Sequence, residues 1–328
     1  MLKTLAHLTA ETAIDLPEQD GLPKSVHVID GDSILAVNAA IVTGRPLLVR
    51  GEPGTGKSQL ARAAAQTLGR AFVQHAVDSR TETRDLLWTQ DSVARLAEAQ
   101  LVGSLPSPTQ ESVERCMAVE NFIHPGPLWW AFDWQSACEQ AKRVRQSPPA
   151  TPKDWTIELG VVVLIDEIDK ADLAVPNGLL DALGHGRFEV PGCATVTMRT
   201  PRPLVLITTN EERALPDAFL RRCFVLHLKL PSTHDALVAA LTGRGRAHFP
   251  RAVCSDAVLS RAAAQLASDR KEATALGLAP PGLAEYIDLL RAVSEQQKTE
   301  AKQLELLSQL AKFAFKKHPE MMEQPMER

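Results

Sequence analysis

The sequence lacks a continuous apolar run long enough to span a membrane. Charged residues also interrupt the stretch from Met1 to Asp20, where a secretory signal needs an apolar core. The five cysteines are scattered, without the close Cys/His pairs of a zinc site: Cys116, Cys138, Cys193, Cys223 and Cys254. We therefore expect a cytoplasmic protein with reduced thiols, which neither enters a membrane nor is secreted.

Basic residues are not in excess either, since the net charge is -4 and the sequence pI is ≈ 6.2. Nucleic acid is therefore not the expected partner, although a local basic patch is compatible with this balance. A GTPase is disfavoured because the Asn-Lys-x-Asp guanine signature is missing. With 328 residues, 45% of them hydrophobic, the chain can form one large domain or two ordinary ones with a buried core.

A glycine-rich stretch lies between the apolar run Leu47–Val49 and a series of helix formers. Strand, glycine loop, lysine, hydroxyl and helix in this order predict a phosphate-binding loop. The glycines allow backbone N–H groups to surround an anion, and the helix adds the positive end of its dipole. A glycine-rich turn without a ligand is the alternative. The expected ATP-binding residues are Gly51, Glu52, Pro53, Gly54, Thr55, Gly56, Lys57, Ser58 and Gln59.

The side chains expected to act on the nucleotide come from this loop and from a later strand. Lys57 would reach the β- and γ-phosphates, and the Ser58 hydroxyl would ligate Mg²⁺. The apolar run Val161–Ile165 predicts a parallel strand covered on both faces, and it ends in Asp166 and Glu167. Asp166 would hold the Mg²⁺, directly or through water, and Glu167 would polarise the attacking water. A strand that merely ends in two exposed acids is the alternative.

Two further motifs follow these acids. The run Leu204–Thr209 predicts a strand, whose end places Asn210 beside the acids in a parallel sheet. Asn210 would orient the hydrolytic water, or else cap the next turn. The adjacent Arg221 and Arg222 either form a solvated helix end or reach the γ-phosphate bound to a neighbouring subunit.

The rest of the pattern predicts alternating strands and helices, then a helical C-terminal part. Short alternating runs on either side of Pro191-Gly192 predict a β-hairpin. The tail carries an apolar stripe that indicates packing on the preceding helices, with partner docking as the alternative: Leu304, Leu307 and Leu310. The other expected elements are strands over 45–50, 71–75 and 224–228, and helices over 32–43, 57–68, 174–183, 233–242, 256–267 and 283–293.

An insertion separates the two nucleotide motifs, because Ser58 and Asp166 are about twice as far apart as a helix, a strand and a second helix require. It spans about 81–156 and begins with an amphipathic segment over 85–101. It also contains every tryptophan of the chain: Trp88, Trp129, Trp130, Trp134 and Trp155. These rings form a local core or, alternatively, an aromatic surface for a substrate or partner.

This combination of motifs resembles the AAA+ ATPases and, among them, the MoxR family. The segments that carry the resemblance are GEPGTGKSQLA, DLLWTQDSVARLAEAQ, PGPLWWAFD, VVLIDEIDKADLAVPNGLL, GRFEVPG, TTNEERALPDAFLRRCFVLHLKLP and PPGLAEYIDLLRA. The resemblance implies that Lys57 and Ser58 belong to Walker A and that Asp166 and Glu167 form Walker B. It also implies Asn210 as sensor 1 and Arg222, with Arg221 beside it, as the arginine finger.

The fold implied by the resemblance is α/β, with a five-stranded parallel sheet sandwiched by helices, the insertion, the β-hairpin and a small all-helical lid. We expect an N-terminal lead-in over 1–30, an ATPase domain over 31–230, and the lid with its helical tail over 231–328. The resemblance also implies homo-oligomeric rings, usually hexamers, that use ATP and Mg²⁺ to remodel a protein substrate. Such rings often work with a von Willebrand factor A-domain partner.

The sequence departs from this family pattern at the lid. Leu278-Ala279 replaces the basic sensor 2 residue that commonly precedes the Pro-Pro pair, and the nearest cations upstream are Arg270 and Lys271. Two functions agree with these features, namely a chaperone-like ATPase and an ATP-dependent assembly scaffold or switch with little turnover. The intact Glu167 and Arg222 favour the first, and the missing cation leaves the second open. The acidic balance disfavours a third, a DNA-translocating motor.

Overall fold

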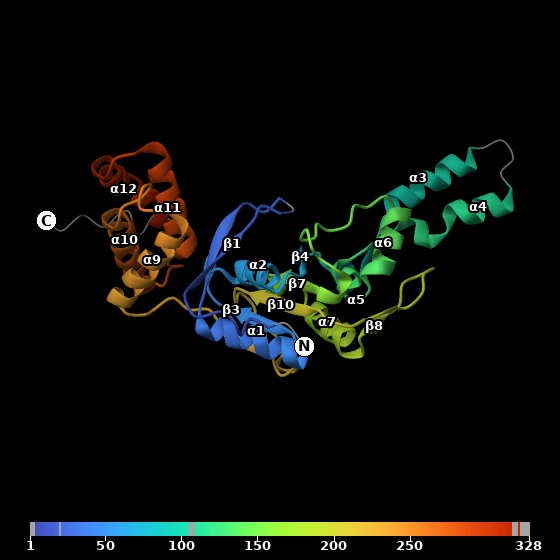
Figure 1. The fold of residues 1–328 in the computed structure, drawn as a ribbon. Coiled ribbons are helices and arrows are strands. Elements are labelled where there is room, and N and C mark those ends of the chain that lie inside the picture. The colour runs from blue at the N-terminus through green and yellow to red at the C-terminus, as the bar shows by residue number, and fades with distance from the viewer. Residues whose placement is uncertain (1–3, 20, 105–108, 317–320, 322–328) are drawn as a thin grey trace.

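The structure is a computed structural model that describes residues 4–19, 21–104, 109–316 and 321. Its centre is a five-stranded sheet of order β11-β3-β10-β7-β4, in which every neighbouring pair is parallel (Figure 1). The strands are β3 (Leu47–Arg50), β4 (Ala71–Ala76), β7 (Val161–Asp166), β10 (Leu204–Thr209) and β11 (Phe224–His227). The predicted five-stranded parallel sheet is confirmed.

Helices cover both faces of the sheet. Its central strands β7 and β10 are therefore buried almost throughout. Alternate strand residues pack against α1 (Gly31–Thr43) and α2 (Lys57–Leu68) on one face. On the other face they pack against α5 (Pro127–Phe132) and α7 (Ala174–His185). This three-layer arrangement is the predicted sandwich.

The N-terminal segment, expected to be a polar lead-in, forms a β-hairpin. Strand β1 (Thr12–Leu16) pairs antiparallel with β2 (Ser25–Ile29), and the buried Ile14, Leu16 and Ile29 belong to the core around α2. In β1 the buried Ile14 and Leu16 flank the exposed Asp15, which is the period-two signal of a half-buried strand. The sequence therefore held a strand signal that the expectation of a lead-in missed.

The insertion is divided into several short elements. A 3-10 turn, Thr83–Leu86, leads into β5 (Trp88–Gln90), which pairs antiparallel with β6 (Ile123–Pro125). The amphipathic segment expected over 85–101 is thus interrupted, and its helix starts only after the cap Asp91. Helices α3 (Ser92–Gly103) and α4 (Gln110–Met117) extend away from the sheet (Figure 1). The remaining elements are α6 (Trp134–Arg143) and the 3-10 turns Val119–Phe122 and Ile157–Leu159.

The tryptophans of the insertion contribute to the main core. Trp129 and Trp130 are each 2% exposed and belong to the apolar cluster on the face of the sheet that packs against α5 and α7. Trp134 and Trp155 pack against that cluster with their ring centroids 4.7 Å apart. The interpretation of these rings as core is confirmed, although the core they join is that of the sheet rather than a separate local one.

The C-terminal part consists of α9 (His234–His248), α10 (Asp256–Ala275), α11 (Leu283–Gln296) and α12 (Glu300–Phe315). They share one apolar core, in which the buried Leu307 and Phe315 of α12 take part. The predicted packing of the tail on the preceding helices is confirmed. Helices had been predicted over 233–242, 256–267 and 283–293, and the corresponding α9, α10 and α11 are all longer than predicted. In the described ranges, no helix combines the length and the apolar character needed to cross a membrane.

Two short elements complete the fold. The predicted hairpin is present but shorter than expected, with β8 (Arg187–Phe188) paired to β9 (Val196–Thr197). Helix α8 (Asp217–Leu220) precedes the edge strand β11, so that Arg221 and Arg222 lie between a helix end and a strand start.

Candidate functional site

The phosphate loop occupies the turn between β3 and α2, at the carboxyl end of the sheet. Gly51 has a φ of 153°, and a Cβ atom there would lie 2.4 Å from the Leu228 carbonyl oxygen, so only glycine fits. Gly56, with a φ of 96°, precedes α2, and no side chain caps this helix start. The first backbone N–H groups of α2 are therefore available to an anion.

Lys57 is almost buried and bonds to three oxygens of its surroundings. Its Nζ donates to the carbonyl oxygens of Gly51 and Glu52 at 2.7 and 2.9 Å, and to Asn210 Oδ1 at 2.7 Å. Burial lowers the pKa of Lys57, and nearby carboxylates, Asp166 foremost, oppose this shift. The sheet thus brings the lysine of the loop to the end of β10, as the parallel topology predicts.

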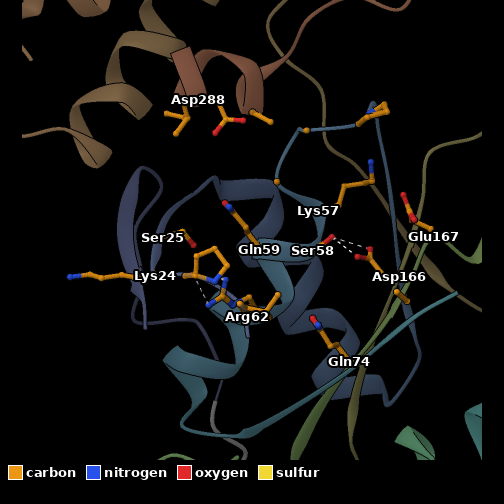
Figure 2. A pocket seen from close by; sticks show the side chains of 18 of the residues that line it. Lys24, Ser25, Lys57, Ser58, Gln59, Arg62, Gln74, Asp166, Glu167 and Asp288 are labelled. Atoms are coloured by element: carbon orange, nitrogen blue, oxygen red, sulfur yellow. Dashed lines mark hydrogen bonds between the residues drawn. The ribbon is translucent and has the colours of Figure 1, made fainter. Parts of the chain in front are cut away.

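Ser58 and Asp166 meet at the second predicted contact. The Ser58 hydroxyl donates to both carboxylate oxygens of Asp166 at 2.9 Å (Figure 2). Thr208 Oγ1 donates to one of the same oxygens at 2.5 Å. A hydroxyl and a carboxylate fit Mg²⁺, which prefers oxygen ligands and usually takes few of them from the protein. In keeping with this, the described residues contain no cluster of three or more His, Cys, Asp or Glu that would hold a metal on its own. The sequence did not predict this role of Thr208, because a buried threonine is common in strands.

Glu167 follows in a left-handed backbone conformation with a φ of 59°, and its amide donates to Thr208 Oγ1 at 2.9 Å. Both of its carboxylate oxygens have partners. Asn210 Nδ2 donates to Oε1 at 3.1 Å, and Lys170 Nζ donates to Oε2 at 2.5 Å. The hydrogen bond to Glu167 raises the pKa of Lys170. The candidate base is therefore held in place by Asn210, which was predicted to lie beside it but to orient the water, and by Lys170, which was not predicted.

These groups line a cavity of about 530 Å³, which is large enough for a nucleotide-sized ligand. The loop and strand ends contribute Pro53, Gly54, Gly56, Lys57, Ser58, Gln59, Asp166, Glu167 and Asn210. Gly51, Glu52 and Thr55 of the predicted set do not line it, and the Thr55 hydroxyl donates to the Glu52 carbonyl oxygen at 2.9 Å. The N-terminal hairpin supplies four residues that the sequence analysis missed: Leu22, Pro23, Lys24 and Ser25.

The lid closes the cavity from the other side. Asp288 stands on α11 facing the loop (Figure 2), and His248, Ala284, Ile287 and Arg291 complete this wall. A Cβ atom on Gly54 would lie 3.0 Å from the Ala284 Cβ atom, so the loop and α11 are in direct contact. Arg270, one of the two cations considered for the lid, binds the Glu52 carboxylate at 2.5 Å and the Pro281 carbonyl oxygen at 3.0 Å. Arg291 is the lid arginine that lines the cavity, and although it belongs to the segment PPGLAEYIDLLRA, no role was predicted for it.

Arg221 and Arg222 lie apart from these residues. Both are exposed and precede β11, whereas the loop follows β3, and the two strands run parallel with Phe224 opposite Leu47. Arg222 is therefore at the end of the sheet where the parallel strands begin, which we call its amino edge. The loop lies at the opposite end, roughly 20 Å away along the strand direction. The structure thus separates the predicted arginine finger from the cavity of its own chain.

His27 is buried behind the phosphate loop, close to Gly56. Burial and, secondly, Arg244 lower its pKa from 6.5 to about 4. As the pH drops below 6.5, His27 of the unfolded chain becomes protonated, whereas His27 of the folded chain stays neutral until about pH 4. The free energy of unfolding therefore falls as the pH drops from 6.5 to about 4.

We expect His27→Gln to reduce this pH dependence. Between pH 7 and pH 5 the free energy of unfolding of the wild type should lose about 2 kcal/mol through this residue. Urea unfolding of both proteins at the two pH values measures the difference. His75 and His248, whose pKa values are also lowered by burial, remain in both proteins and cancel in the comparison. An equal loss in both proteins would contradict the assignment.

Similarities to this chain are found among known families and solved structures. A family model described as AAA domain (dynein-related subfamily) matches residues 46–223. Among solved structures, a candidate ATPase from Cytophaga hutchinsonii is 15% identical, with 85% of this chain and 78% of that chain covered and a TM-score of 0.38. A mutant RuvB from Thermotoga maritima is also 15% identical, with 82% and 71% covered and a TM-score of 0.35. Both TM-scores are too low to support anything further, and no curated protein matches the sequence.

Proposed function

We propose, because the chain belongs to the AAA domain family of the dynein-related subfamily, that it binds Mg²⁺-ATP at the phosphate loop and hydrolyses it. One observation carries the proposal. Lys57, Ser58, Asp166 and Glu167 come from two segments far apart in the sequence and line the same cavity, each with a geometry that fits its task.

The tasks follow from the contacts of each side chain. Lys57 exchanges its present acceptors for phosphate oxygens, and the open N–H groups of α2 bind the same anion. Ser58 and Asp166 would hold Mg²⁺, which neutralises phosphate charge when it is bound. Glu167 takes the proton of the attacking water, and Asn210 fixes the carboxylate by its hydrogen bond.

The proposal includes a second copy of the chain. Arg222 lies at the amino edge of the sheet and cannot reach the phosphates of its own chain. In a head-to-tail assembly it would stabilise the charge that develops on the γ-phosphate of a neighbour. Such an interface repeats from copy to copy and forms a ring if the rotation closes. We therefore propose a ring, hexameric by resemblance to MoxR proteins.

For the same reason we propose a role of the MoxR type, in which the ring remodels a protein substrate or a von Willebrand factor A-domain partner. The contact between Gly54 and Ala284 supports a mechanical link, because a change at the phosphates would move the lid directly. The sequence resemblance alone supports the choice of a protein substrate.

A second candidate function is a nucleotide-dependent scaffold with little turnover. The ion pair between Lys170 and Glu167 favours it, because Lys170 occupies one of the two carboxylate oxygens that would have to accept the proton of the attacking water. Rapid release of phosphate by the assembled wild type would exclude this candidate.

The proposal is tested by Lys57→Ala. Losing a charged donor to the phosphates should weaken ATP binding roughly 10- to 100-fold. Titration with a fluorescent ATP analogue measures the affinity, and Lys142→Ala, which removes an exposed lysine at the end of α6, is the matched control. Unchanged affinity in Lys57→Ala would remove the proposed nucleotide site.

A further inference from the structure

Arg270 of α10 connects the lid to the phosphate loop. Its guanidinium group donates to the Glu52 carboxylate at 2.5 Å and to the Pro281 carbonyl oxygen at 3.0 Å, at the turn that leads into α11. The next residue of this turn, Gly282, lies against the same loop, since a Cβ atom there would be 3.3 Å from the Pro53 carbonyl oxygen. One side chain of α10 therefore holds the start of α11 against the phosphate loop.

The ion pair between Arg270 and Glu52 is shielded from water on the side of the lid. Only 17% of the Arg270 side chain is exposed, whereas 47% of the Glu52 side chain is. A guanidinium group that is shielded in this way loses more when its counter-charge is removed than an exposed one does. Its planar fork also serves two acceptors at once, which a lysine ammonium group on a flexible stem does less well. The contact is therefore more than a pair of charges on the surface.

Glu52 also takes part in the hydrogen bonds that change when an anion enters the loop. Its carbonyl oxygen accepts from Lys57 Nζ at 2.9 Å and from the Thr55 hydroxyl at 2.9 Å. Phosphate oxygens that take over the Lys57 ammonium group would release this carbonyl oxygen and allow the backbone to rearrange at Glu52. The same residue thus faces Lys57 with its backbone and the lid with its side chain.

We infer that Arg270 couples the position of the lid to nucleotide occupancy through Glu52, as a positioning residue that does not itself touch the phosphates. Arg270 is not among the described residues that line the cavity, so its route to a nucleotide is the phosphate loop. The coupling requires no cation at Leu278-Ala279, because the loop itself transmits the presence of the phosphates. The inference rests on the proposed function, since it needs a nucleotide at the loop.

Hydrogen exchange followed by mass spectrometry tests the coupling, because it reports on the loop and on the lid separately in one sample. The probe is a non-hydrolysable ATP analogue with Mg²⁺, added to the full chain at a saturating concentration. In the wild type we expect slower exchange in the phosphate loop, 51–58, and also in the lid segment 276–290. A coupling of ordinary strength would slow exchange in the lid about 5- to 150-fold.

Two variants remove the ion pair from its two sides. In Arg270→Gln and in Glu52→Gln the analogue should still protect the loop, while the slowing of exchange in the lid falls at least about fivefold. Glu52→Gln leaves the core of the lid untouched and decides the test if Arg270→Gln unfolds the lid. The double variant should lose no more than either single variant, because both substitutions break one contact. Lys271→Gln, which removes the exposed neighbouring charge, is the control and should respond like the wild type.

A lid that responds to the analogue in both single variants as it does in the wild type would overturn the inference. A double variant that loses far more than either single variant would also overturn it, because Arg270 would then act by a route other than Glu52. Loss of the lid response in Arg291→Gln, with the response of Arg270→Gln intact, would assign the coupling to the arginine that lines the cavity and overturn the inference.

The wild type separates this inference from the proposed function. A loop protected by the analogue beside a lid that does not respond would overturn the inference and leave nucleotide binding intact. A loop that the analogue does not protect would refute the proposed function, and the inference with it.

Discussion

Arg222→Ala is expected to lower the rate of ATP hydrolysis by roughly 10³-fold or more while the affinity for ATP stays close to that of the wild type. The physical reason is the position of Arg222, at the amino edge of the sheet and away from its own cavity. Its charge is then missing only at a neighbour's transition state. Phosphate release under saturating ATP and titration with a fluorescent ATP analogue measure the two quantities.

Mixing provides the control for this prediction. A Lys57→Ala chain should bind ATP only weakly, yet it retains Arg222 and would present it to the next copy. In a mixture, the Arg222→Ala chain supplies an intact phosphate loop and the Lys57→Ala chain supplies Arg222. Sites formed between the two variants should therefore hydrolyse ATP, although neither variant forms such a site alone. Full activity of Arg222→Ala by itself, or no recovery in mixtures that assemble, would contradict a shared site.

Glu167→Gln is expected to reduce hydrolysis by about 10²- to 10⁴-fold without weakening ATP binding. An amide cannot take the proton of the attacking water, but it has nearly the shape of the carboxylate and can still accept the hydrogen bond from Asn210. The variant should therefore retain ATP, which nucleotide recovered from the purified complex would show. Glu189→Gln, an exposed site in the hairpin region, serves as the control. A loss of binding equal to the loss of turnover would assign Glu167 a structural role instead.

The sequence predicted the parts of the fold in which local chemistry and tertiary structure agree. The short, β-branched apolar run before Asp166 predicts a buried strand, and the structure has β7 there. Gly44 and Gly69 end their helices in left-handed conformations, as expected after long helical patterns. The loop motif was recognisable because its chemistry is contained in eight consecutive residues.

The parts that the sequence did not predict depend on contacts between distant segments. Nothing near Arg291 or Lys24 indicates that the lid and the N-terminal hairpin meet at the phosphate loop. Lys170 follows the acids by three residues, but only the turn Ile168–Lys170 points its ammonium group back at Glu167. The break at the start of α3 depends on pairing of β5 with β6, a strand more than thirty residues further along the chain.

The hydrogen bonds of Lys57 have a consequence for how the chain distinguishes ATP from ADP. Asn210 Oδ1 is one of three acceptors of its ammonium group, so a phosphate oxygen that takes its place releases this amide from Lys57. The same amide also holds Glu167. A triphosphate offers Lys57 one more phosphate group than a diphosphate does. We therefore expect the triphosphate to reorient the base through Asn210 more strongly than the diphosphate.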